Sequence, residues 1–138
     1  MRDIDCGGLR FDVYHNLYFV DRTNFEINKI PYEEIFIHNT KFGLEKDGGA
    51  PNPQFEKLYN SKNARELVNV DPICIEKKQE FLYWGNSLQT DGGTIHMGFT
   101  EPFIKAIPFQ TYVFDDLAYV SSIATNDNFL FFISELST

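Results

Sequence analysis

Short segments in which apolar and polar residues alternate are the feature of this sequence that most constrains its fold. Residues 9–14 and 25–30 alternate with a period of two, which is typical of strands with one face on the core. Between them, the turn His15-Asn16 leads into a returning apolar segment at 17–20. A further short apolar run covers 35–37. We therefore predict an antiparallel meander over the first third of the chain.

The second half of the sequence repeats this strand-like composition. The predicted strands there are residues 73–75, 80–84, 94–99, 111–114 and 118–120. Turn residues separate them at Asp91-Gly92-Gly93, Glu101-Pro102 and Asp115-Asp116. We expect these strands to continue the antiparallel sheet.

A helical pattern interrupts the strands near the middle of the chain. Asn52 is a suitable N-cap and Pro53 a suitable first helical residue, and the apolar residues that follow recur at helical spacing. Pro72 then ends the stretch. We predict one or two helices within residues 53–68.

The C-terminal segment fits two structures. Polar residues at 125–128 precede Phe129, Phe132, Ile133 and Leu136, a spacing that favours a short amphipathic helix over 128–136. The same residues are rich in β-forming side chains, so an edge strand over 129–133 is the alternative. We favour the helix.

The length of the chain predicts a single domain. With 138 residues and 16.0 kDa, residues 1–138 are enough for one hydrophobic core without metal or disulfide support. Only Cys6 and Cys74 are present, too few for a disulfide framework. The predicted fold is therefore a single-domain α+β protein: a mostly antiparallel sheet with one or two central helices and a C-terminal helix.

Acidic residues dominate the charge of the protein, most of all in its second half. The formal net charge is -8, and residues 70–138 hold 9 acidic against 3 basic residues. A field of this sign repels phosphate backbones, so we expect no nucleic-acid partner. The excess either keeps the protein soluble or forms a docking face for a basic protein.

Recognised catalytic and metal-binding motifs are missing. His15, His38 and His96 are far apart in sequence, and the two cysteines form no Cys-x-x-Cys pair, so zinc spacing is not present. No nucleophile elbow or phosphate-binding glycine loop occurs. We therefore expect no catalytic residues, no metal and no cofactor.

One combination of residue types does point to a binding surface. Aromatic and acidic residues mix between residues 84 and 127, and protein interfaces use rings for affinity and charges for steering. In the alternative interpretation the rings belong to the core and the acids to turns. The candidate partner-binding residues are Trp84, Asp91, Glu101, Tyr112, Asp115, Asp116 and Tyr119.

The second half of the chain resembles the SUKH superfamily. Phe81-Leu82-Tyr83-Trp84-Gly85, the Asp91-Gly92-Gly93 turn and the segment Thr94–Phe99 are similar to that family's apolar-Trp-Gly strand, glycine turn and following strand. Residues 123–136 are similar to its closing helix. Many bacterial members are immunity proteins that neutralise toxins, and the resemblance implies such a role here.

These observations together predict a non-enzymatic immunity-type protein. Its acidic, aromatic face is expected to bind and neutralise a basic, nuclease-like bacterial toxin. The alternatives are a small-molecule-binding domain or enzyme with a Phe-lined pocket, and a phage or assembly subunit. No secretory leader and no apolar run of membrane-spanning length is evident, so we expect a cytoplasmic protein without a membrane partner.

Overall fold

The computed structural model shows a protein built almost entirely from antiparallel strands. It describes residues 6–41, 54–60, 70–76, 78, 81–86, 94–101, 110–113, 119–126 and 128–135. The described strands are β1 (Cys6–Phe11), β2 (Leu17–Asp21), β3 (Glu26–Ile30), β4 (Glu56–Tyr59), β5 (Val70–Ile75), β6 (Phe81–Asn86), β7 (Thr94–Phe99), β8 (Gln110–Val113), β9 (Tyr119–Thr125) and β10 (Leu130–Glu135). One helix accompanies them, α1 (Tyr32–Lys41).

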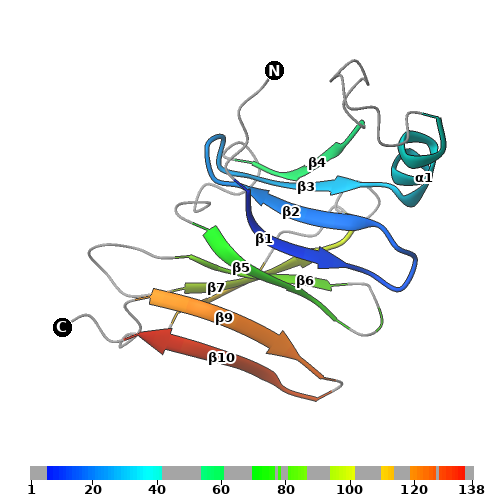
Figure 1. Ribbon diagram of the computed structural model, residues 1–138. Coiled ribbons are helices and arrows are strands. Elements are labelled where there is room, and N and C mark those ends of the chain that lie inside the picture. Colours follow the sequence, from blue (N-terminus) through cyan, green and yellow to red (C-terminus); the bar gives the residue numbers. More distant parts are fainter. Residues whose placement is uncertain are drawn as a thin grey trace.

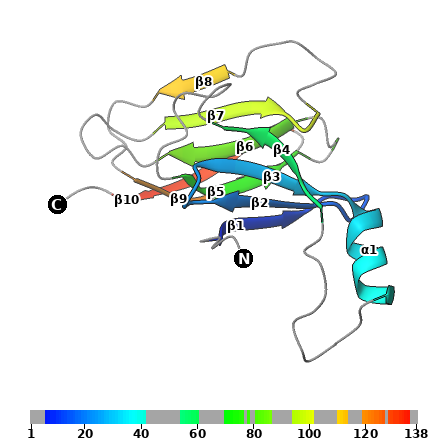
Figure 2. The same ribbon diagram turned by 90° about the horizontal axis from the view of Figure 1, so that it is seen from above.

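The strands form three stacked layers (Figure 1). Sheet A has the order β1-β2-β3-β4, sheet B the order β5-β6-β7-β8, and the hairpin β9–β10 forms the third layer. Sheet B lies between the other two (Figure 1). Seen from above, α1 lies beside sheet A, beyond the end of β3 (Figure 2). The described architecture is therefore an antiparallel β-sandwich with an additional hairpin layer.

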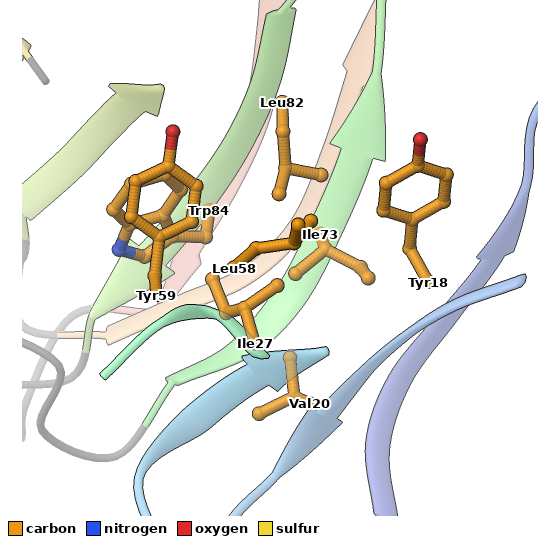
Figure 3. Packing of buried hydrophobic residues seen from close by; sticks show 8 residues of the cluster. All are labelled: Tyr18, Val20, Ile27, Leu58, Tyr59, Ile73, Leu82 and Trp84. Carbon is orange, nitrogen blue, oxygen red and sulfur yellow. The ribbon is translucent and has the colours of Figure 1, made fainter. Parts of the chain in front are cut away.

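The upper core fills the space between sheets A and B (Figure 3). It takes side chains from both sheets: Tyr18, Val20, Ile27, Leu58, Tyr59, Ile73, Leu82 and Trp84. Several are large and almost completely buried, Trp84 and Tyr18 being the largest. Their burial supplies the main free energy that holds the two sheets together.

The lower core lies between sheet B and the hairpin. Its buried members are Cys74, Ile95, Val120 and Ile123, and Tyr83 and Leu130 pack against them. Neighbouring residues of sheet B thus face opposite cores: Ile73 contributes to the upper core and Cys74 to the lower one. A sheet buried on both faces explains the nearly continuous apolar segments 73–75 and 81–84, which do not alternate.

The predicted meander at the start of the chain is confirmed, and polar side chains hold its first turn. β1 pairs with β2 and β2 with β3, all antiparallel. The Asp12 carboxylate accepts hydrogen bonds from the backbone N–H groups of Tyr14 and Asn16, from Asn16 Nδ2 and from the Tyr18 hydroxyl. His15 adopts a left-handed conformation with φ 66°, which closes the turn.

Residues 35–37 are helical, so their assignment to the meander is wrong. α1 starts directly after Pro31, whose carbonyl accepts hydrogen bonds from the N–H groups of Glu34 and Ile35. Asn16 Oδ1 accepts a further bond from the first helical N–H, that of Tyr32. Proline followed by two acidic residues is a helix-start signal that outweighs a three-residue apolar run.

The central helix prediction is also wrong where the structure describes it. Residues 56–59 form β4, which pairs with β3, and residues 61–68 lie outside the described residues. The register shifts between Ile27 and Asn28, so that β4 carries an extra residue at Leu58. This bulge directs both Leu58 and Tyr59 into the upper core, which imitates helical spacing in the sequence.

The predicted C-terminal helix is replaced by β10, the second strand of a hairpin. Asn126 and Asn128, two of the polar residues expected to cap a helix, lie between β9 and β10 instead. Asn126 Oδ1 accepts hydrogen bonds from the N–H groups of Asn128 and Phe129, and Asn126 N–H donates to Phe129 O. Asn stabilises turns by the same side-chain chemistry with which it caps helices, so the pattern alone did not separate the two.

The α+β assignment with central and C-terminal helices is therefore corrected to a mostly antiparallel β fold. The strand predictions at 73–75, 80–84, 94–99, 111–114 and 118–120 correspond to β5 to β9. The resemblance to the SUKH superfamily stays a prediction, without the closing helix that it implied.

Candidate functional site

The predicted binding residues are placed very differently by the structure. Asp91, Asp115 and Asp116 lie outside the described residues. Tyr112 occupies β8 opposite Ile95, and Tyr119 occupies β9 opposite Glu135. Glu101 is exposed just after β7. The structure therefore does not gather these seven residues into one described surface.

Trp84 belongs to the upper core. Its side chain is 1% exposed, and its ring packs against Tyr59, with 4.9 Å between the centroids. On the other side it stacks on the His96 ring at 5.5 Å and an interplanar angle of 16°. A ring enclosed in this way offers no face to a partner protein, so the core interpretation applies to Trp84.

His96 is a buried, neutral member of the same aromatic stack. It is 1% exposed, and Nε2 lies 2.8 Å from Thr94 Oγ1. Burial lowers its pKa from 6.5 to about 4, because the charged imidazolium loses its hydration. His96 is therefore uncharged at neutral pH, and its ring contributes packing rather than charge.

Exposed apolar side chains gather instead on the hairpin, on the surface that faces away from sheet B. We call Phe129, Phe131 and Ile133 the outer hairpin face. Their exposed fractions are 65%, 54% and 62%. Leu130, which lies between the first two in sequence, points the other way and packs on the lower core. Opposite them on β9, Phe131 pairs with Ala124 and Ile133 with Ser122, both small residues. Two large rings and an isoleucine thus stand on solvent.

The strand pairing explains how these side chains come to be exposed. In an antiparallel hairpin, alternate residues point to opposite faces, and only one face of β10 can contact sheet B. The outward positions therefore stay in water whatever residues occupy them. If residues 129–133 had been interpreted as a strand from the sequence, the period of two would have placed Phe129, Phe131 and Ile133 together on one face.

The sequence around the outer hairpin face contains acidic but no basic residues. Residues 106–138 include Asp115, Asp116, Asp127 and Glu135, and no Lys or Arg. The edge strand β10 also has no charge between Phe129 and Ser134, although lysines commonly protect such edges against pairing.

Within the described ranges, no group of three or more His, Cys, Asp and Glu side chains is arranged to hold a metal ion. The described helix α1 lacks the length and apolarity that a membrane span requires.

Comparisons with protein-family models and with curated proteins find no match to this sequence. Function is therefore inferred from the residues and their geometry alone.

Proposed function

We propose that this protein is a non-enzymatic binding protein whose outer hairpin face docks onto a basic protein partner. The exposure of Phe129, Phe131 and Ile133 on one face of an edge hairpin is the observation that supports the proposal. Residues exposed to this degree contribute little to folding, whereas buried rings dominate the energy of protein interfaces.

The charge of the chain selects the class of partner. A protein of net charge -8 attracts basic proteins over distances of about a Debye length and repels acidic ones. Among basic partners we favour a bacterial nuclease-type toxin, whose phosphate-binding cleft is positively charged. The protein then acts as its immunity protein by covering that cleft.

A comparison of three proteins tests this function. Wild type, the double variant Phe131→Ser/Ile133→Ser and the matched control Phe36→Ser are tagged and used to capture partners from a lysate of the native host at low salt. Phe36 lies on α1 and is 53% exposed, nearly the same as Phe131, so the control removes one comparably exposed ring from another surface. The captured polypeptide is then purified and its affinity measured with each protein.

The proposal predicts one basic polypeptide that is toxic when expressed alone and harmless when co-expressed. Its affinity should fall at least about tenfold in the double variant and stay within twofold in the control, as for loss of a hot spot. Equal binding by all three proteins, or no stoichiometric capture by folded wild type, contradicts the proposal. A wild-type homodimer that dissociates in the double variant also contradicts it, because the face then binds a second copy.

A further inference from the structure

A groove lies where the edge strands of the three layers meet. Its volume is about 360 Å³. In the described sheets, β1, β5 and β9 each pair with a single neighbour and thus form the margins of their layers. The lining includes Arg10, Phe11, Asp12, Cys74, Ile75 and Ile123. This volume falls within the range of small-molecule sites, which starts near 300 Å³.

The inner part of the groove is apolar. Ile75 and Ile123 contribute aliphatic surface, and Cys74 is a buried free thiol. Burial raises the pKa of this thiol to about 12, so it is neutral and acts as a small apolar group. The one phenylalanine in the lining is Phe11, so this groove differs from the Phe-lined pocket considered from the sequence.

Arg10 is the cation of the lining, and it has hydrogen-bonding capacity to spare. Its Nη1 donates to Leu9 O at 2.7 Å, which uses one of five guanidinium N–H donors. Among the described residues no carboxylate forms an ion pair with Arg10. The other charged lining residue, Asp12, directs its carboxylate to Tyr14, Asn16 and Tyr18 within the turn.

We propose that this groove binds a small monocarboxylate with an apolar body, its carboxylate on Arg10 and its chain over Ile75 and Ile123. An arginine fork matches a carboxylate with two parallel hydrogen bonds, and the apolar lining gives the remainder of the ligand a place out of water. The site is distinct from the outer hairpin face and does not depend on the proposed function.

An extended peptide is the competing occupant, because a strand edge can accept an added strand. Two observations favour the small molecule. The Arg10 side chain already occupies Leu9 O, a group that an added strand would need. The three margins also belong to different layers, so an added strand could pair with only one of them.

Octanoate is a suitable probe, and octanol is its uncharged control. Binding is measured by titration calorimetry and mapped by NMR on protein with labelled isoleucine methyl groups. The variant Arg10→Gln removes the guanidinium and keeps a donor for Leu9 O. Its matched control is Arg22→Gln, which makes the same charge change in the turn between β2 and β3.

Wild type and Arg22→Gln should bind octanoate about tenfold more tightly than octanol, and Arg10→Gln should lose that preference. The methyl signals of Ile75 and Ile123 should shift in all three proteins. Equal affinity for both probes, a preference that survives in Arg10→Gln, or shifts confined to other isoleucines would overturn the proposal. So would the absence of any binding at millimolar octanoate.

Discussion

Gly98 provides the most direct test of how sheets A and B are joined. It lies in β7, where that strand passes under Tyr59 of sheet A. A methyl group at this position would overlap the hydroxyl and ring of Tyr59 and press on Trp84. The same hydroxyl donates a hydrogen bond of 2.7 Å to Phe99 O, which links the two sheets. The substitution Gly98→Ala should therefore displace Tyr59 and break this link.

The cost follows from two terms. Overpacking in a dense core costs about 1–3 kcal/mol, and the lost hydrogen bond about 0.5–1.5 kcal/mol. We expect Gly98→Ala to lower the free energy of unfolding by about 2–4 kcal/mol, which lowers Tm by roughly 10 °C for a domain of this length. Urea unfolding followed by fluorescence of Trp84 measures the change, because this ring lies at the site.

The variant Tyr59→Phe supplies the internal control. Alone it should cost about 1 kcal/mol, since it removes only the hydroxyl. In its background, Gly98→Ala should cost at least about 1 kcal/mol less than in wild type, because the closest overlapping atom is gone. A cost of Gly98→Ala below about 0.5 kcal/mol, or additivity of the two changes, would refute the packing described between β4 and β7.

Three further predictions concern a buried imidazole, a buried amide and the acidic segment. Burial lowers the pKa of His96 from 6.5 to about 4, so between these pH values the unfolded chain binds a proton that the folded protein does not. The free energy of unfolding should therefore be highest above pH 6.5 and fall by about 3 kcal/mol as the pH drops towards 4. Unfolding measured across pH should show a smaller change in the variant His96→Gln. Asn28 is completely buried, and neither polar atom of its side-chain amide has a hydrogen-bond partner among the described residues. The variant Asn28→Leu should therefore raise the free energy of unfolding, measured by urea titration, by about 1–2 kcal/mol. A lower free energy of unfolding in this variant would mean that the amide is hydrogen-bonded in the wild type. Reversing the charge at Asp115 and Asp116 to Lys should slow association with the captured partner about tenfold at low salt and hardly at high salt; an unchanged rate would exclude an acidic docking segment.

The described strands other than β4 and β10 could be predicted because each has a local signal in the sequence. Alternation indicated β1 and β3, an apolar segment after a turn indicated β2, and turn residues in the sequence, such as Asp91-Gly92-Gly93, separated the later predicted strands. The helix α1 was missed although Pro31 and two acidic residues precede its core, because the three-residue apolar run within it was given more importance.

The errors at Leu58 and Asn126 have a different origin, since they depend on contacts remote in sequence. Leu58 faces the core because β4 is bulged against β3, which the sequence of β4 does not encode by itself. Asn126 closes a hairpin because β9 is there to pair with β10. Correcting this second error also changed the candidate interface. Only a strand places Phe131 and Ile133 side by side on an outer surface, and the helix prediction did not.

The measurement that tests the proposed function most directly is hydrogen–deuterium exchange on the complex with the captured partner. If the outer hairpin face is the docking surface, binding should slow exchange in β9 and β10 and leave α1 and the turn at 12–16 unchanged. Protection of α1 or of that turn, with β10 exchanging as in the free protein, would contradict the proposal.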